Sequence, residues 1–177
     1  YESRGNVFNN TRKYDRAIED YDQALRLEPD SAQAFSDRGA AWYFKGEYQK
    51  AVADYDAAIR LDSDRAQTYT NRGAALRKLG RSELALKDET SAIRIDPSVP
   101  EYFDNRGLSL AGNGDYAGAI ADYDEAIRID PGFALAYNNR GDAWFNKGDL
   151  DSALADFSAA IKYDPSLAIA YGNRGFA

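Results

Sequence analysis

Apolar residues recur along the chain at the three- and four-residue spacing that is typical of amphipathic α-helices. The segment 32–65 shows this pattern twice, with one apolar stripe for each of two helices. Between the stripes stands the sequence KGEY, in which Gly46 is placed to take the left-handed conformation that ends a helix. The segment is therefore predicted to fold as helix, tight turn, helix. The stripe residues are Phe35, Gly39 and Trp42 in the first helix and Ala51, Tyr55, Ala58 and Ile59 in the second.

The whole pattern recurs every 34 residues, and self-similarity at a fixed period of this length indicates a repeat architecture. An arginine followed by a glycine marks the same place in every unit, although glycine inside a helix costs about 1 kcal/mol relative to alanine. The register predicts a single array, divided into 1–31, 32–65, 66–99, 100–133, 134–167 and a partial sixth unit, 168–177. The marker pairs are Arg4-Gly5, Arg38-Gly39, Arg72-Gly73, Arg106-Gly107, Arg140-Gly141 and Arg174-Gly175.

The helix boundaries are marked by residue type as well. Glycines equivalent to Gly46 stand at the end of the first helix in the later units, whereas the first unit has Arg12 at this place. At the helix starts, three pairs of residues fit a capping box, in which two side chains satisfy opposing backbone amides. These predicted capping boxes are Asp30 with Gln33, Asp64 with Gln67, and Ser98 with Glu101.

The residues that recur at equivalent places in the units resemble the tetratricopeptide repeat, and the resemblance covers the whole chain. It implies an all-α fold, a right-handed superhelical α-solenoid of about eleven helices arranged in antiparallel pairs. It also implies that Gly73 faces Ala85 where two helices approach closely, so that packing offsets the cost of a helical glycine. The family's succession of large, small and aromatic residues is met in Tyr137, Gly141, Trp144, Ala153, Phe157, Ala160 and Pro165.

Composition narrows the range of functions. The formal charge of −7 and the pI of about 4.7 disfavour binding to a nucleic-acid backbone. Cysteine and histidine are absent, which removes thiolate chemistry and the commonest metal ligand and general base, so neither a metal site nor a cofactor is expected. No apolar run approaches the roughly 20 residues that span a bilayer, and membrane insertion is not expected. The chain starts without Met inside a unit, so we expect a piece of a longer array, and its compartment stays open.

Arginine departs from the family pattern, which usually has leucine at this place. An aspartate column in the second helices accompanies it, and we therefore predict Arg–Asp pairs at the helix interfaces. The partner of each arginine lies either in its own unit or in the preceding one; the sequence leaves both open. The alternative is an arginine whose stem packs on the surface while its head lies in water. The predicted ion-pair residues are Arg38, Arg72, Arg106 and Arg140 with Asp54, Asp88, Asp122 and Asp156.

The residue before each arginine is a candidate for peptide binding. Within the family the first helices line a concave surface, and an asparagine amide placed there offers both a donor and an acceptor to a peptide backbone. The alternative is that asparagine is simply common at this place in the family. The candidates are Ser3, Asp37, Asn71, Asn105, Asn139 and Asn173, and the four consecutive asparagines among them form the predicted ladder.

Other candidates for the groove follow from the same helix face. Tyr43 and Phe44 are expected to supply an apolar pocket in the second unit and Phe145 another in the fifth, unless these aromatic rings belong to the core. Arg77 and Lys78 form a basic step suited to an acidic side chain of a ligand.

In the third unit, Glu89 replaces the aromatic residue of the other units. Its carboxylate must find an arginine or reach water.

The function favoured by these patterns is a scaffold that binds an extended peptide or a helix of a partner protein. The first alternative is a structural module that associates end to end with its own copies through apolar helix faces. An RNA-binding helical repeat is a weaker alternative, because the pI is acidic. An enzyme ranks last, because acidic pairs such as Asp20 and Asp22 stand two residues apart and do not face each other on a helix.

Overall fold

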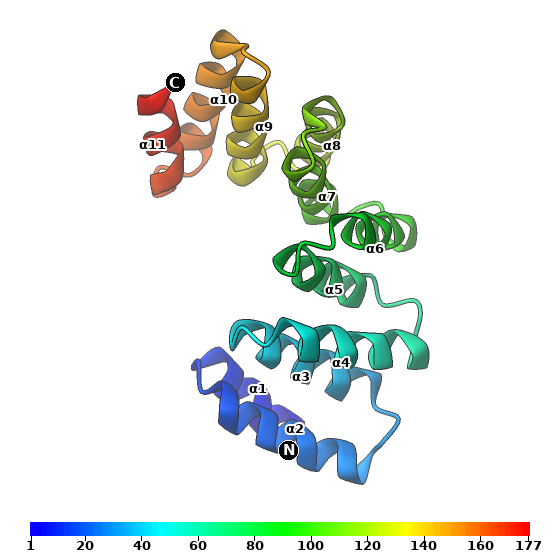
Figure 1. Cartoon of the computed structure of the whole chain (residues 1–177). Helices are drawn as coiled ribbons and strands as arrows, with labels where there is room; N and C mark the ends of the chain where they lie inside the picture. The colour runs from blue at the N-terminus through cyan, green and yellow to red at the C-terminus, as the bar shows by residue number, and fades with distance from the viewer. The chain divides into compact units, whose positions relative to one another are not determined.

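The computed structural model describes residues 1–177, and eleven α-helices without any strand make up the fold (Figure 1). The all-α prediction is therefore confirmed. The helices are α1 (Glu2–Asn10), α2 (Tyr14–Leu27), α3 (Ala32–Phe44), α4 (Tyr48–Leu61), α5 (Ala66–Lys78), α6 (Ser82–Ile95), α7 (Pro100–Gly112), α8 (Tyr116–Ile129), α9 (Ala134–Asn146), α10 (Leu150–Tyr163) and α11 (Ala168–Phe176).

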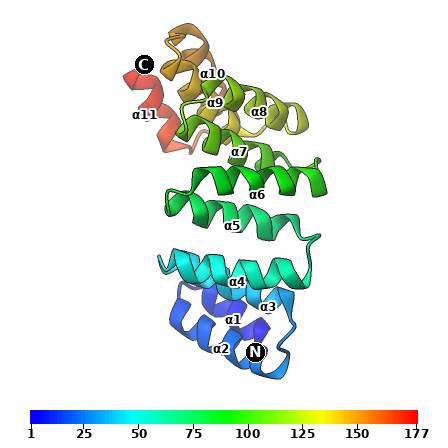
Figure 2. The same ribbon diagram turned by 45° about the vertical axis from the view of Figure 1, so that its right-hand side comes forward.

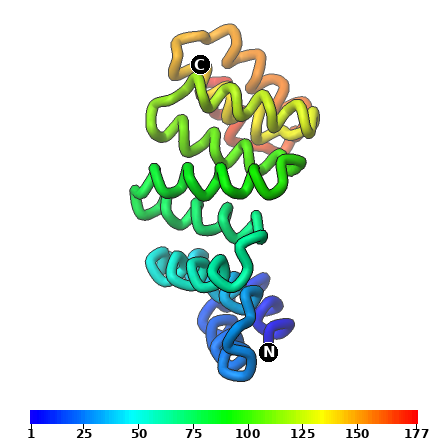
Figure 3. The backbone as a smooth tube through the Cα atoms, turned by 90° about the vertical axis from the view of Figure 1, so that its right-hand side faces the viewer, coloured from blue at the N-terminus to red at the C-terminus, as the bar shows by residue number.

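The chain divides into two compact units, Tyr1–Ile95 and Asp96–Ala177. In the first unit, α1 packs on α2, α3 on α4 and α5 on α6, and each pair stacks on the next through α2 with α3 and α4 with α5 (Figure 2). In the second unit, α7 packs on α8 and α9 on α10, while α8 contacts α9 and α10 contacts α11. Tight turns join the two helices of each pair, so that the helices run antiparallel (Figure 3). Each unit is thus a stack of antiparallel helix pairs, which is the architecture of an α-solenoid.

In four of the five helix pairs the core consists of small residues packed against one aromatic ring, and the exception is the pair α5–α6. The ring, on the second helix, lies against the helical glycine of the first: a Cβ added to Gly107 would come within 2.6 Å of the Tyr123 ring, and one added to Gly39 within 2.8 Å of the Tyr55 ring. Glycine is required here because the ring occupies the space of a side chain. The fully buried rings are Tyr21, Tyr55, Tyr123 and Phe157, and the alanines of the column beside them, Ala17, Ala51, Ala85, Ala119 and Ala153, are equally buried.

The first helices end as the sequence predicts. Gly46 has a φ of 87°, and the three equivalent glycines have φ values between 70° and 85°. Arg12, which replaces this glycine in the first repeat, takes the same left-handed conformation with a φ of 58°. In each case the next residue closes the helix end with a hydrogen bond, as Glu47 N donates to Trp42 O over 2.9 Å.

The predicted capping boxes are wrong. Asp30, Asp64 and Ser98 do not cap helices, because α3, α5 and α7 have Ser31, Arg65 and Val99 as their N-caps. Ser31 Oγ accepts a hydrogen bond from Ala34 N over 3.1 Å. The other two candidates are held in a turn instead, since the backbone N–H groups of Asp64 and Ser98 donate to the carboxylates of Asp62 and Asp96 over 3.1 and 3.0 Å. The acidic residue that closes one helix thus organises the turn into the next.

Two glycines of α7 provide a matched test of the packing between the helical glycine and the aromatic ring. Gly107→Ala is expected to destabilise the protein by about 1–3 kcal/mol, because the methyl group forces the Tyr123 ring to move. Gly112→Ala is expected to stabilise it by about 0.5–1 kcal/mol, because nothing lies within 4 Å of the added carbon and alanine favours the helix. Thermal unfolding followed by circular dichroism measures both, and a Gly107→Ala protein as stable as the wild type would contradict the packing argument.

Candidate functional site

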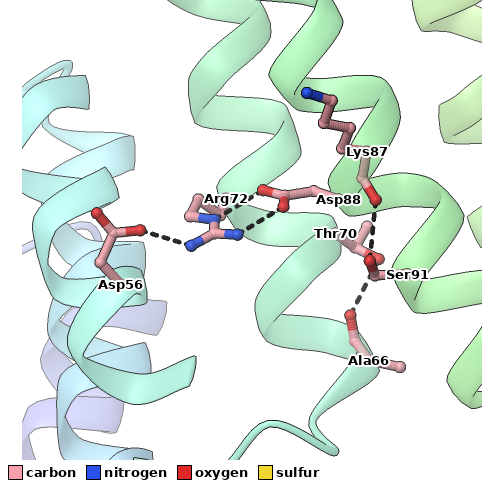
Figure 4. Close-up of polar contacts among 7 residues, drawn as sticks. All are labelled: Asp56, Ala66, Thr70, Arg72, Lys87, Asp88 and Ser91. Atoms are coloured by element: carbon pink, nitrogen blue, oxygen red, sulfur yellow. Dashed lines mark hydrogen bonds and ion pairs between the residues drawn. The ribbon is translucent and has the colours of Figure 1, made fainter. Parts of the chain in front are cut away.

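The arginine of each first helix is the centre of a polar contact between helices. Arg72 of α5 donates from Nε and Nη2 to the two carboxylate oxygens of Asp88 on α6, over 2.7 and 2.6 Å. Its Nη1 donates to Asp56 on α4, over 2.5 Å (Figure 4). One guanidinium therefore joins three helices that belong to two successive repeats.

The same geometry recurs along the chain. The aspartate of the predicted column that binds each arginine belongs to the arginine's own repeat, and three of the arginines also bind a carboxylate of the preceding repeat. Arg38 binds Asp54 and Asp22, and Arg140 binds Asp156 and Asp124. Arg106 binds Asp122, and Arg4 binds Asp20, in each case through two hydrogen bonds. The second aspartates, Asp22, Asp56 and Asp124, were not among the predicted pairs, although each stands two residues after an aspartate of the predicted column.

The two carboxylates on one arginine differ in burial. The Asp156 side chain is 9% exposed, whereas that of Asp124 is 57% exposed. The hydrogen bonds that Arg140 donates to Asp156 raise the pKa of Arg140 above its ordinary value despite burial, and those that Arg38 donates to Asp54 do the same for Arg38. Each arginine also lies over an aromatic ring one turn earlier on its own helix, as Arg140 does over Tyr137 at 5.4 Å from the ring centroid. The guanidinium therefore stays charged in a partly buried position.

This difference in burial predicts different effects of the two aspartates of Arg140. Asp156→Ala is expected to cost about 3–5 kcal/mol, because it removes the buried partner of a partly buried charge. Asp124→Ala is expected to cost at most about 1 kcal/mol, because its carboxylate is solvated. Chemical denaturation of both variants measures the difference, and equal losses would show that the buried bidentate pair does not determine stability.

The third repeat replaces an aromatic contact with an ion pair. Glu89 is fully buried at the place where the other repeats have Tyr or Phe, and Arg77 of α5 forms an ion pair with it. Arg77 was expected to offer its charge to a ligand, and this expectation is corrected: the guanidinium binds Glu89 inside the helix pair. Only Lys78 of the predicted basic step is exposed.

The Arg77–Glu89 pair can be exchanged for the residues of the second repeat, which has Tyr43 and Tyr55 at these two places. The double variant Arg77→Tyr/Glu89→Tyr is expected to be as stable as the wild type or more stable by about 1–4 kcal/mol, because a buried ion pair replaced by packed apolar groups loses its desolvation cost. Arg77→Ala alone is expected to cost about 3–5 kcal/mol. Melting temperatures of the two proteins test this, and a double variant less stable than Arg77→Ala would contradict it.

The asparagines predicted as a ladder fall into two groups. In the second unit they contact their own surroundings: Asn139 Nδ2 donates to Asp104 Oδ1 over 2.9 Å, and Asn173 Nδ2 donates to Asn138 Oδ1 over 3.1 Å. Asn105 Nδ2 donates to the backbone oxygen of Glu101 over 2.8 Å. These amides hold first helices together or bind their own helix.

Phe145, which was expected to supply a pocket of its own, packs instead against Phe176 of α11, with the ring centroids 5.7 Å apart.

In the first unit the predicted residues come together. A pocket of about 130 Å³ between α3 and α5 is lined by Tyr43, Phe44 and Asn71, together with Ala40, Ala74 and the ring of Tyr55 at its base. Phe44 is 60% exposed at the rim, where its ring also stacks on Tyr14 at 5.9 Å. The pocket thus combines aromatic rings with one amide.

Asp37 lies one turn before Ala40 on the same face of α3. Gln33 donates to its Oδ1 over 2.8 Å, while Oδ2 is buried and accepts no hydrogen bond. Burial raises the pKa of the Asp37 carboxyl above its ordinary value.

Two other features of the chain bear on its chemistry. The structure holds no cluster of three or more acidic side chains arranged to bind a metal ion. None of the eleven helices combines the length and the apolar character that crossing a membrane requires.

Comparison with known proteins places these features in a family. Two sequence profiles described as tetratricopeptide repeat match the chain, one over residues 43–100 and 105–174 and the other over residues 6–70. The crystal structure of YrrB, described as a TPR protein with an unusual peptide-binding site, is 26% identical with a TM-score of 0.78, covering 99% of this chain and 90% of YrrB. The crystal structure of MamA is 25% identical with a TM-score of 0.82, covering 96% of this chain and 99% of MamA. A tetratricopeptide repeat protein from Parabacteroides merdae shares the fold at 22% identity, with a TM-score of 0.84 over 98% of this chain and 69% of that protein. No curated protein sequence matches the chain.

Proposed function

Because the chain belongs to the tetratricopeptide repeat family, we propose that it is an interaction scaffold that binds an extended segment of a partner protein. The binding surface is the first-helix face, formed by α1, α3 and α5 in the unit Tyr1–Ile95. The observation that carries the proposal is the pocket that unites Tyr43, Phe44 and Asn71 on this face. The similarity to YrrB, whose description includes a peptide-binding site, supports the same kind of ligand.

The polar groups beside the pocket suit a peptide backbone. Gln67 donates to Asn71 Oδ1 over 2.9 Å, so the Asn71 amide nitrogen keeps its hydrogens for a carbonyl of the ligand. Asp37 Oδ1, which accepts one hydrogen bond from Gln33 at an exposed place, has a second lone pair for a backbone N–H. A donor and an acceptor on adjacent first helices hold an extended chain without reading its side chains, while the aromatic pocket selects one apolar residue. Lys78, exposed at the end of α5, favours an acidic residue next to it.

End-to-end association between copies stays a prediction. The feature that favours it is the set of large apolar side chains that α11 exposes, Ile169, Tyr171 and Phe176.

Selection of peptides followed by binding to variants tests the proposed surface. Peptides selected from a random dodecamer library on the wild-type protein are labelled, and their affinity is measured by fluorescence anisotropy. Asn71→Ala and Phe44→Ala are each expected to weaken binding by about tenfold, the equivalent of about 1.4 kcal/mol, because each removes a contact of the pocket.

Asn105→Ala is the matched control, because this asparagine stands at the same place in the repeat but binds the backbone of its own helix. Its affinity for the selected peptides is expected to equal that of the wild type. Undiminished binding by both Asn71→Ala and Phe44→Ala would refute the first-helix face as the binding surface.

A further inference from the structure

A second pocket, of about 330 Å³, lies between α4, α5 and α6 and shares no residue with the pocket on the first-helix face. Its apolar wall is made by Val52, Leu76 and Leu84. Arg72 lies at the pocket with its two carboxylates, Asp56 and Asp88. Two further cations, Arg81 and Lys87, complete the lining.

At the pocket the third repeat has a smaller residue at a position that tryptophan fills in two other repeats, and the fourth repeat likewise has leucine, Leu110, at this place. Leu76 stands at the place of Trp42 in the second repeat and Trp144 in the fifth. The Trp42 indole packs against the buried clusters of two second helices, α2 and α4, and Lys50 lies over its ring at 4.5 Å. Trp144 packs in the same way on the cluster around Ile120. Leucine leaves the volume of the missing ring open.

Of the two cations at the pocket, Lys87 is particular to the third repeat, whereas Arg81 has one cationic counterpart, Lys13 of the first repeat. Arg81 directly precedes α6, at the place where Glu47, Asp115 and Asp149 are the N-caps of α4, α8 and α10. The helix dipole favours an anion at this end, so arginine there works against the stability of α6. Lys87 replaces an alanine that stands at the equivalent position of the second, fourth and fifth repeats.

Neither cation is used within the chain. Neither Arg81 nor Lys87 forms an ion pair within the chain, whereas Arg72 beside them forms two. In Figure 4 no dashed line joins the Lys87 amine to any of the other residues drawn. Leu76, Arg81 and Lys87 thus meet at one pocket and give it an apolar wall with two available positive charges.

We propose that this pocket binds a large apolar side chain of an acidic segment of a partner protein. The anchor is an aromatic residue, which fills the space that tryptophan fills in the second and fifth repeats. Aspartate or glutamate residues on either side of the anchor pair with Arg81 and Lys87, which gives the contact its charge complementarity. This surface is independent of the first-helix face, so one chain holds two segments at once.

A synthetic peptide tests the pocket. The probe is a fluorescein-labelled dodecapeptide with a single Trp flanked by Asp and Glu, and its binding is measured by fluorescence anisotropy at low salt. The wild-type protein is expected to bind it, and a peptide with Ser in place of Trp or Lys in place of the acids is expected to bind at least about tenfold more weakly. Absence of probe binding to the wild type would overturn the proposal.

Leu76→Trp fills the pocket with the residue that two other repeats accept at this place. It is expected to keep the melting temperature at or above that of the wild type while weakening probe binding by at least about tenfold. Leu110→Trp is the matched control, since Leu110 holds the same place in the fourth repeat, and it is expected to leave probe binding unchanged. Equal binding of the probe by Leu76→Trp and the wild type would overturn the assignment of the pocket.

Arg81→Asp separates binding from stability. It places an anion before α6, so the melting temperature is expected to rise, while probe binding falls by at least about tenfold because a cation is lost.

Asn71→Ala is expected to leave probe binding unchanged. This control distinguishes a failure of the pocket between α4, α5 and α6 from a failure of the first-helix face. A concentration-dependent dimer in sedimentation that Leu76→Trp abolishes would overturn the choice of occupant and assign the pocket to a second copy of the chain.

Discussion

The contact on which the repeat stack depends is one guanidinium held by two carboxylates from different repeats. The planar fork of arginine presents several donors in fixed directions, so Arg72 binds Asp88 through two hydrogen bonds and still reaches Asp56 with a third nitrogen. Lysine, a point charge on a flexible stem, would not fix three helices in this way. The bidentate bond is buried inside the helix pair, and the single bond lies at the more exposed junction between pairs. One arginine side chain thus forms both a polar contact within its own repeat and a contact with the preceding repeat. Contacts of this nearest-neighbour kind hold a stack of repeats together.

Departures from the repeat pattern concentrate in the helix pair α5–α6. There a buried ion pair, Arg77 with Glu89, takes the place of aromatic packing. There also Leu76 opens a pocket, and Arg81 gives up a favourable helix cap. Two of these changes work against stability by ordinary physical criteria, since buried charges cost desolvation and a cation before a helix opposes the dipole. Proteins keep such features mainly at places that serve function. The same helix pair also supplies Asn71 to the pocket on the first-helix face.

The predicted site residues illustrate which inferences from sequence are reliable. Tyr43, Phe44 and Asn71 meet in one pocket because a helical face and a constant repeat offset are enough to bring them together. Arg77 and Phe145 were placed on the same face by the same reasoning, but their partners, Glu89 and Phe176, come from other helices. The asparagines of the second unit likewise bind neighbours that no spacing rule selects, as Asn139 does with Asp104. The capping boxes failed because an aspartate at the end of one helix competes for the same backbone amides.

The sequence by itself determined the features that depend on local chemistry. Apolar periodicity defines the eleven helices, and the 34-residue period sets the order of the pairs. In four of the five pairs a glycine in the left-handed conformation ends the first helix. For Arg38, Arg72 and Arg140, one partner is the aspartate of the predicted column 16 residues after the arginine, and the other is an aspartate 16 residues before it that lies outside the predicted column. Only the tertiary structure showed that one side chain reaches both. The same holds for the pocket beside Leu76, because an empty volume depends on how far three helices stand from one another, and no single segment of the sequence encodes that distance.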